Sequence, residues 1–263
     1  MTSHDHTENP AGPRLFVDAT LAPGAAVALG PEQTHYLLRV MRRAPGSAVL
    51  AFNGRDGLWH ARIDAGDRRR VVLAVETQVQ QQPTAHGPWL AFGIPKRPAL
   101  ELILQKGTEL GAARFLPVAS ARSQAERLNP ERLSRIVIEA AEQCERLDLP
   151  EVSPVQRLGD FLDNWPAERA LLWCDEQGDG VPLADALDGL FADEQAAEPR
   201  PWGLMTGPEG GFATGELDGL AELPFVTKVA LGPRILRAET AALAALAIGQ
   251  ALAGDGDLPV RAL

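Results

Sequence analysis

The 263-residue chain is poor in cysteine. Cys144 and Cys174 stand far apart and form no CxxC motif, which argues against a disulfide framework and a cysteine zinc site. The five histidines show neither HxxxH nor HExxH spacing, so we expect no metal ion. The longest wholly apolar run, residues 241–248, is too short for a helix that crosses a bilayer, which needs about 20 residues. We therefore expect a cytoplasmic protein that does not enter a membrane.

Lysine is also scarce: three lysines stand among 25 basic residues, and the formal net charge is −10. An acidic chain is at first sight a poor partner for nucleic acid, because Lys and Arg neutralise phosphate. The acid is concentrated, however, since residues 175–200 carry −7 and residues 1–82 carry +1. Local basic patches are therefore possible near the N-terminus. The excess of arginine is by itself better explained by a compositional bias of the genome, and we interpret the acidic stretch as a solvated excursion.

Two domains are predicted. Residues 1–13 form a flexible tail, because they lack the basic start and apolar stretch of a secretory signal. Residues 14–82 alternate short β-rich runs with turns such as Asn53-Gly54, which is typical of a small β-barrel, and residues 31–41 form a short helix within it. After a polar linker, residues 83–263 form an α/β domain.

The α/β prediction depends on apolar runs that alternate with helical patterns. This alternation favours a mostly parallel sheet covered by helices, with strands at residues 89–94, 114–118, 170–174, 202–206 and 226–231. Among the helices, residues 130–147 place Cys144 on the apolar stripe, so we expect a packed thiol. The last helix, residues 239–252, is apolar on nearly every side and must be buried in a core or against a second subunit.

The strongest local motif is the glycine-rich segment Thr-Gly-Pro-Glu-Gly-Gly-Phe at residues 206–212, directly after a predicted strand. Ligands of open α/β sheets bind at the carboxyl ends of strands, and glycine allows the backbone to approach them closely. The segment lacks the lysine of a P-loop, and Glu209 would repel phosphate. We infer a neutral or cationic ligand without phosphate. An empty tight turn is the alternative.

A second motif, residues 231–240, also follows a predicted strand and leads into the last helix. Arg234, Arg237 and Glu239 are charges beside a helix that is otherwise apolar, which is costly unless they face a site. The presence of Glu239 in the first turn of this helix has a simpler explanation, because an acid there interacts favourably with the helix dipole.

Together, residues 207–212 and 231–241 closely resemble the motifs of the RsmE family of ribosomal RNA small-subunit methyltransferases, which belong to the knotted SPOUT class. Further segments resemble that family in matching order over residues 14–252, namely residues 35–42, 105–111, 120–123 and 139–146. Ala121, Tyr36 and residues 96–98 depart from the family's usual glutamate, second histidine and Lys-Gly.

The resemblance implies a PUA-like β-barrel that binds RNA, followed by a SPOUT α/β domain with a C-terminal trefoil knot. It implies methylation of N3 of a uridine in 16S rRNA, expected at uridine 1498, by a homodimer. The methyl donor S-adenosylmethionine would be bound by Met205, Thr206, Gly207, Glu209, Gly210, Gly211, Leu231, Gly232, Ile235 and Leu236.

The resemblance also assigns roles to charged residues. Arg237 would stabilise charge on a uracil oxygen, and Glu239 would position Arg237 or accept the N3 proton. A structural ion pair is the alternative for these two. RNA phosphates would be bound by Arg14, His35, Arg39 and Arg42 in the barrel and by Lys96, Arg122 and Arg146 in the second domain, although each taken singly fits a solvated surface equally well.

Two other functions are compatible with the sequence. One is a SPOUT methyltransferase that acts on another RNA, which the N-terminal barrel motif disfavours. The other is a dimeric RNA-binding protein without catalytic activity, which the intact glycine loop and the charges at Arg234, Arg237 and Glu239 disfavour.

Overall fold

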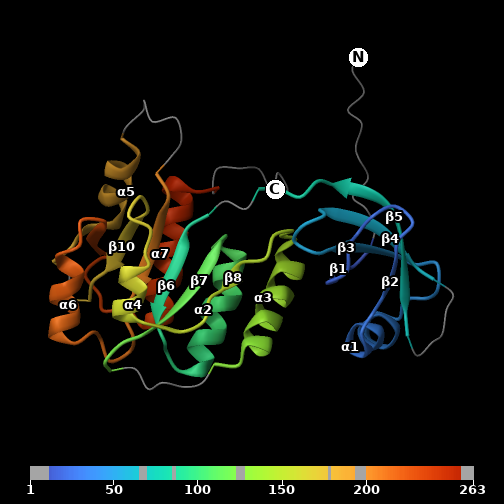
Figure 1. Cartoon of the computed structure of the whole chain (residues 1–263), viewed down its shortest axis with the longest axis horizontal. Helices are drawn as coiled ribbons and strands as arrows, with labels where there is room; N and C mark the ends of the chain where they lie inside the picture. The colour runs from blue at the N-terminus through green and yellow to red at the C-terminus, as the bar shows by residue number, and fades with distance from the viewer. Residues whose placement is uncertain are drawn as a thin grey trace, which may run out of the picture. The chain divides into compact units, whose positions relative to one another are not determined.

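The computed structural model describes residues 12–64, 70–84, 87–122, 128–176, 179–192 and 200–255. Most of the predicted N-terminal tail and Ser123 of the 120–123 motif lie outside these residues. The chain divides into two compact units (Figure 1). The first unit consists of residues 1–84 together with 141–148, and nearly all of the remaining chain forms the second unit.

The first unit contains a five-stranded sheet in the order β1-β3-β4-β5-β2. Its strands are β1 (Arg14–Phe16), β2 (Ala26–Ala28), β3 (Ala48–Phe52), β4 (Leu58–Ile63) and β5 (Val72–Gln80). All pairs are antiparallel except β1 with β3. One side chain in two is buried along most of β4, which gives this unit its own core around Val49, Ala61 and Leu73.

The predicted helix at residues 31–41 is present, but its second half is wound differently. Helix α1 (Pro31–His35) has Pro31 at its first turn and continues into a π-helical segment, η1 (Tyr36–Val40). Leu37 is fully buried and anchors the segment in the core of the first unit. The π-helical winding was not predictable from the spacing of apolar residues.

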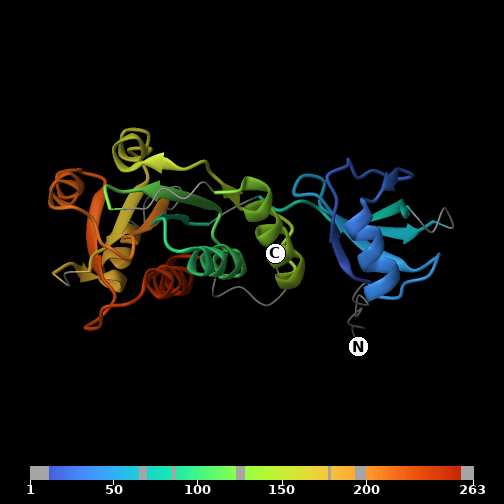
Figure 2. The same cartoon turned by 90° about the horizontal axis from the view of Figure 1, so that it is seen from below.

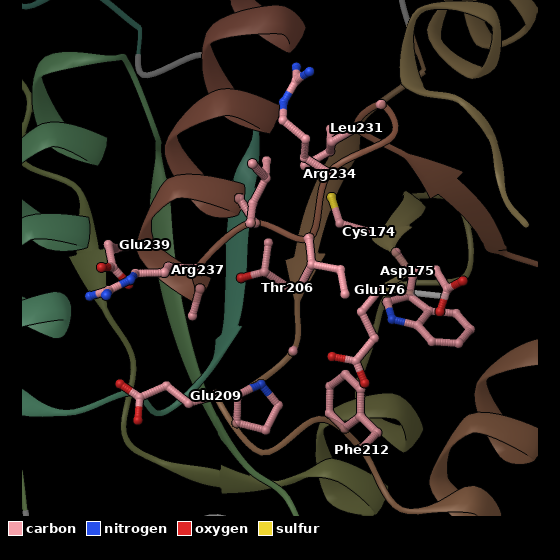
Figure 3. Close-up of a pocket in the computed structure, with 18 of the residues that line it drawn as sticks. Cys174, Asp175, Glu176, Thr206, Glu209, Phe212, Leu231, Arg234, Arg237 and Glu239 are labelled. Atoms are coloured by element: carbon pink, nitrogen blue, oxygen red, sulfur yellow. The ribbon is translucent and has the colours of Figure 1, made fainter. Parts of the chain in front are cut away.

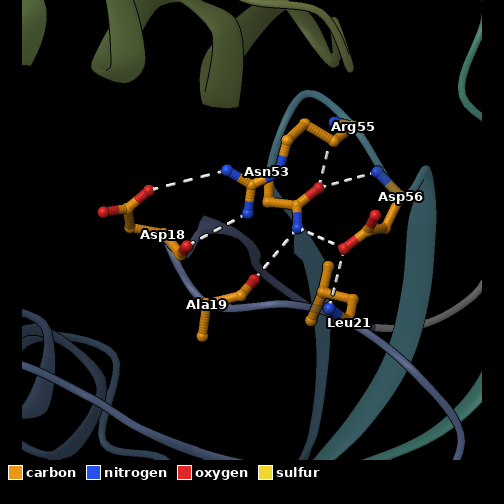
Figure 4. Close-up of polar contacts among 6 residues, drawn as sticks. All are labelled: Asp18, Ala19, Leu21, Asn53, Arg55 and Asp56. Carbon is orange, nitrogen blue, oxygen red and sulfur yellow. Dashed lines mark hydrogen bonds and ion pairs between the residues drawn. The ribbon is translucent and has the colours of Figure 1, made fainter.

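A polar network secures the predicted Asn53-Gly54 turn between β3 and β4 (Figure 4). The Asn53 side-chain oxygen accepts hydrogen bonds from the backbone N–H groups of Arg55 and Asp56. Its amide donates to the Asp56 carboxylate at 2.6 Å and to the carbonyl of Ala19. The backbone N–H of Leu21 and this amide together lower the pKa of Asp56. The turn is thus joined to the segment that follows β1.

The second unit is built on a parallel eight-stranded sheet, as the sequence predicts. Its order is β11-β13-β10-β12-β6-β7-β8, and β9 also pairs with β7. The strands are β6 (Trp89–Gly93), β7 (Arg114–Ala119), β8 (Glu151–Val152), β9 (Gln156–Arg157), β10 (Ala170–Cys174), β11 (Val181–Pro182), β12 (Trp202–Thr206) and β13 (Val226–Ala230). The long strands are nearly continuously apolar because helices cover both faces of the sheet.

Successive side chains of one strand enter different cores, so each face of the sheet has its own helices. Leu204 packs with α2, α3, α5 and α7, whereas Met205 packs with α4 and α6 (Figures 1 and 2). The helices are α2 (Arg97–Glu109), α3 (Pro130–Cys144), α4 (Leu158–Asp163), α5 (Leu183–Phe191), α6 (Thr214–Ala221) and α7 (Ala238–Ala253). Helix α7 packs against both α2 and α5.

The interpretation of residues 175–200 as a solvated excursion is wrong for much of the segment. Strand β11 and helix α5 lie within it, and Leu183 and Leu187 are buried in the core. The two leucines stand four residues apart, so they share one helix face, while Asp185 and Asp188 remain at other positions of the helix. Residues 193–199 lie outside the described part of the chain.

The expected packing of Cys144 is also wrong. This residue is exposed, and its sulfur lies 3.8 Å from the carbonyl oxygen of Ala141. Cys144 is the last residue of α3, so the helical spacing that predicted its burial ends there. Within the described residues, no helix is both long enough and apolar enough to cross a membrane.

Candidate functional site

A cavity of about 800 Å³ lies at the carboxyl ends of four neighbouring strands of the second unit. Its wall includes Lys96 after β6, Asp175 after β10, residues 206–209 at the end of β12, and residues 231–239 after β13. The strands are parallel, so all four loops emerge at one edge of the sheet. The volume is in the range of small-molecule sites. The two sequence motifs therefore meet in one cavity.

The first loop needs glycine at two positions. At Gly211 the backbone has a φ of +64°, and a Cβ atom there would collide with the carboxylate of Glu176. At Gly93, the last residue of β6, a Cβ atom would collide with Pro208 of the loop. The loop therefore packs directly on the neighbouring strand, and backbone groups rather than side chains form much of this wall.

The predicted cofactor residues of the first loop divide into two groups. Thr206, Gly207 and Glu209 line the cavity. Met205, Gly210 and Gly211 are not among the lining residues, and Met205 is fully buried in the core beside α4 and α6. Since these three belong to the same strand and turn, they shape the loop from behind.

The second loop contributes all of its predicted residues. Leu231, Gly232, Ile235 and Leu236 line the cavity, and Gly232 has a φ of +102°. The Ile235 side chain is 87% exposed. Such exposure is unusual for an isoleucine, and it leaves an apolar surface at the mouth of the cavity.

Arg237 and Glu239 lie at the start of α7. Arg237 is exposed and directly precedes the helix, whereas Glu239 is half-buried in its first turn. Figure 3 shows both side chains on one side of the cavity, away from Asp175 and Glu176. No ion pair joins them among the interactions found in the described residues. Both charged groups are thus available to a molecule in the cavity.

The side of the cavity that holds Asp175 and Glu176 is acidic (Figure 3). Glu209 and Glu239 also line the cavity. Asp175 is 9% exposed, and its carboxylate lies 3.1 Å from the Lys228 ammonium group on β13. Lys228 also pairs with Asp179, which raises the pKa of the lysine and lowers that of Asp179. These carboxylates favour a cationic ligand over a phosphate.

A buried hydroxyl group points to a ligand at the centre of the site. Thr206 is 1% exposed, and its Oγ1 atom has no hydrogen-bond partner within the described part of the protein (Figure 3). Leaving such a group unpaired costs roughly 1–3 kcal/mol. A bound molecule that hydrogen-bonds to Thr206 would remove this cost. The acidic wall and this hydroxyl both fit S-adenosylmethionine, which carries a sulfonium charge and no phosphate.

Cys174 forms a neutral part of the wall. It ends β10, lines the cavity, and burial of its thiol raises the pKa from 9.0 to about 12. The thiol is therefore protonated near neutral pH. Across the described residues, no group of three or more His, Cys, Asp or Glu side chains is arranged to hold a metal ion.

Three of the predicted RNA-binding residues lie together in the first unit. His35, Arg39 and Arg42 are exposed on α1, on η1 and just after η1. Arg14 is different, because its side chain is 15% exposed and donates to the Glu145 carbonyl at 2.6 Å. Arg146 is 10% exposed and makes two hydrogen bonds to Asp148.

The other two predicted RNA-binding residues lie beside the cavity. Lys96 lines it and forms an ion pair with Glu209, with 3.6 Å between Nζ and Oε2. Arg122 donates a hydrogen bond to the carbonyl of Gly210 at 3.0 Å. These cations are thus next to the loop that is predicted to bind the cofactor.

Sequence reasoning missed several residues of the site. Asp175 and Glu176 directly follow a correctly predicted strand, so the rule used for residues 206–212 would have found them. Glu216 was missed as well. Its carboxylate accepts hydrogen bonds from the backbone N–H groups of Ala121 and Ala213 and so joins the segment after β7 to the start of α6. Only the folded chain brings these segments together.

Comparison with known proteins identifies the family. A family model described as RNA methyltransferase domain matches residues 85–250, and one described as RNA methyltransferase PUA domain matches residues 29–76. The ribosomal RNA small subunit methyltransferase E of Synechocystis sp. is 36% identical over 241 residues, which cover 89% of this chain and 76% of that protein. This chain belongs to the ribosomal RNA small subunit methyltransferase E family. The resemblance inferred from the motifs is thereby confirmed.

Further members of the small subunit methyltransferase E family match over most of their length. The Bacillus subtilis protein is 30% identical and covers 89% of this chain and 94% of its own. A solved structure of the Neisseria gonorrhoeae member, bound to S-adenosyl methionine, has a TM-score of 0.79 at 29% identity and covers 94% of this chain and all of that one. A Legionella pneumophila protein described as a putative methyltransferase with bound cofactor SAM has a TM-score of 0.75 at 26% identity, with 92% and 98% covered.

Proposed function

We propose that the protein is an S-adenosylmethionine-dependent methyltransferase that methylates N3 of one uridine in 16S rRNA of the small ribosomal subunit. The observation that carries this proposal is the single cavity between the two glycine-bearing loops, with the unpaired Thr206 hydroxyl inside it. The names of the relatives and the S-adenosyl methionine in the Neisseria structure support it.

The cofactor would be held mainly by backbone groups of residues 206–209 and 231–236, with Met205, Gly210 and Gly211 shaping the first loop from behind. When bound, S-adenosylmethionine supplies an electrophilic methyl group next to its sulfonium charge. Asp175, Glu176 and Glu209 give the cavity the negative charge that suits this sulfonium. The Thr206 hydroxyl supplies a hydrogen-bonding group at the bottom of the site.

Arg237 and Glu239 have complementary roles in this proposal. The N3 nitrogen of uracil becomes a nucleophile when its proton leaves, and the negative charge then spreads to the carbonyl oxygens. Arg237 is exposed at the cavity and stabilises that charge. Glu239 is half-buried nearby and either positions Arg237 or accepts the proton.

We further propose the SPOUT architecture, with a C-terminal trefoil knot in residues 83–263 and a small PUA-like β-barrel in residues 14–82. The strand order agrees with such a fold, because β10 lies between β12 and β13, which follow one another along the chain. The chain must therefore cross over β10 before it enters α7. The match of residues 29–76 to a PUA domain model supports the barrel.

A homodimer is proposed on the basis of α7. One face of this helix is buried by Ala242, Ala245 and Leu246, whereas Ala247, Ala251 and Leu252 are exposed and apolar. Such a helix is expected to bury its other face against a second subunit. Because its substrate is rRNA, we also propose that the protein works in the cytoplasm. The proposed RNA-contacting residues are His35, Arg39 and Arg42, together with Arg14, Lys96, Arg122 and Arg146.

The decisive experiment uses small subunits from a strain that lacks the gene. These are incubated with the purified protein and S-adenosylmethionine, and nucleosides of the 16S rRNA are mapped by mass spectrometry. We expect one new N3-methyluridine. Methylation at another position or in another RNA would reject the proposed substrate. In parallel, Arg237→Ala should abolish turnover while S-adenosylmethionine affinity, measured by calorimetry, stays within a few-fold.

A further inference from the structure

The π-helical end of α1 in the first unit carries an exposed aromatic side chain. Tyr36, the single tyrosine of the chain, is 37% exposed, and Val40 is 62% exposed. They are four residues apart in η1 and therefore stand on one side of this wide turn, while Leu37 between them is buried. The Tyr36 hydroxyl has no hydrogen-bond partner within the described residues. Tyr36 and Val40 thus form an apolar strip that faces solvent and does not contribute to the core of the unit.

Basic residues stand beside this strip. His35, Arg39 and Arg42 are exposed on the same segment, and residues 31–43 contain three arginines against one acid, Glu32. In a chain of net charge −10, this local excess of positive charge is suited to phosphate. An aromatic face between cations is the arrangement with which proteins bind single-stranded nucleic acid, since a base stacks on the ring and cations hold the backbone.

The backbone at this place is held in two uncommon conformations. The Met41 N–H donates to the Tyr36 carbonyl, five residues back, and π-helical turns are concentrated at functional sites. Arg42 has a φ of +51°, and the Arg43 N–H closes the helix end on the Leu37 carbonyl. Glycine is the usual residue at such a helix end, and an L-residue there costs roughly 1–2 kcal/mol. The backbone therefore presents the exposed Arg42 side chain at this turn at a cost in stability.

We propose that Tyr36 and Val40 form a stacking platform for an unpaired base of the rRNA, and that His35, Arg39 and Arg42 hold the phosphates on either side of it. This inference rests on the proposed function, because the ligand is the RNA substrate of the same enzyme. It adds a residue and a mode of recognition, since stacking selects single-stranded loops over paired helices.

The test measures binding of full-length protein to a fluorescein-labelled single-stranded oligouridylate. Tyr36→Ala should weaken binding roughly five- to 100-fold, whereas Tyr36→Phe, which keeps the ring, should bind like the unaltered protein. Val79→Ala is the matched control, because Val79 is 40% exposed on β5 of the same unit and is not one of the predicted RNA-binding residues. The thermal midpoint and the S-adenosylmethionine affinity of every variant should match those of the unaltered protein, which shows that both units are folded.

Salt dependence separates stacking from charge. Tyr36→Ala should leave the slope of log K against log salt unchanged, whereas Arg39→Ala should reduce its magnitude by about one. Equal affinity of Tyr36→Ala and unaltered protein would overturn the platform. So would a change of oligomeric state in Tyr36→Ala, because the strip would then be a protein interface. If the unaltered protein itself neither binds RNA nor methylates small subunits, the proposed function fails instead.

Discussion

At the scale of single residues, the cavity is defined by groups that the folded protein alone leaves unsatisfied. The Thr206 hydroxyl is the clearest case, because it is buried and unpaired at the end of β12. A hydroxyl of this kind lowers the stability of the free protein, and a ligand that hydrogen-bonds to it removes this cost. A substitution of Thr206 should therefore affect the stability of the free protein and its affinity for the ligand in different ways.

Thr206→Val tests this separation. The substitution removes an unpaired hydroxyl at nearly constant volume, so the thermal midpoint of the free protein should stay the same or rise. Affinity for S-adenosylmethionine should fall on the order of ten-fold, which corresponds to about 1.4 kcal/mol for one hydrogen bond. Calorimetry and thermal unfolding measure the two quantities. Thr227→Val, on β13 and outside the cavity lining, is the control; a lower midpoint with unchanged affinity in Thr206→Val would contradict the role of this hydroxyl.

Cys174 predicts a dependence of stability on pH. Burial raises the pKa of its thiol from 9.0 to about 12. Between these values the unfolded chain has lost the proton and the folded protein keeps it, so the free energy of unfolding falls as pH rises. The contribution of the Cys174 thiol to the free energy of unfolding is fully present below pH 9.0. Above pH 9.0 it decreases by about 1.4 kcal/mol for each pH unit.

Denaturant unfolding of the unaltered protein and of Cys174→Ala, from about pH 8 to about pH 10.5, measures this effect. The unaltered protein should lose stability more steeply above pH 9.0, and the two curves should run parallel below it. Parallel curves throughout would show that the Cys174 thiol is not buried.

At the scale of elements, the first glycine loop depends on its contact with strand β6. Gly93→Ala would place a methyl group against the ring of Pro208, within 2.8 Å of its Cβ atom. We expect the loop to shift, S-adenosylmethionine affinity to fall by about ten-fold or more, and stability to fall by roughly 1–3 kcal/mol. Gly159→Ala in α4, where a Cβ atom meets nothing within 4 Å, should bind normally. Normal binding by Gly93→Ala, measured by the same calorimetry, would mean that the loop does not form the site.

Helix α7 makes a prediction about assembly. Leu252 is 51% exposed on its outer face, and Leu252→Glu should weaken the proposed dimer by about ten-fold or more. Sedimentation equilibrium measures this change. Val155→Glu, at a residue of similar exposure (40%) between β8 and β9, should leave the dimer intact. A protein that is monomeric before any substitution would contradict the assignment of α7 to a subunit interface.

Element prediction succeeded where one signal was strong and failed where signals competed. Strands β10 and β12 have the predicted bounds, because a short apolar run before a turn has few alternatives. Helix α5 was missed because its acids concealed the pair Leu183 and Leu187. The π-helical η1 and the exposure of Cys144 depend on tertiary contacts, which periodicity does not contain.

At the scale of the whole molecule, function follows from strand order. The loops after β6, β10, β12 and β13 are distant in sequence, and the parallel sheet brings them to one edge. The sequence predicted that two of these loops would meet. It did not predict that Asp175 would complete the wall and pair with Lys228, because this pairing needs β10 beside β13. The arginines near η1 likewise make this segment positively charged, although the net charge of the whole chain is −10.

The central claim is that the loops after β12 and β13 enclose one site for S-adenosylmethionine. Calorimetric titration of the full-length protein with S-adenosylmethionine tests it most directly, with Gly93→Ala and Thr206→Val measured beside it. The account predicts saturable binding at one site per chain, weakened in both variants. Absence of binding heat together with no shift in thermal midpoint, or binding that both variants leave unchanged, would contradict it.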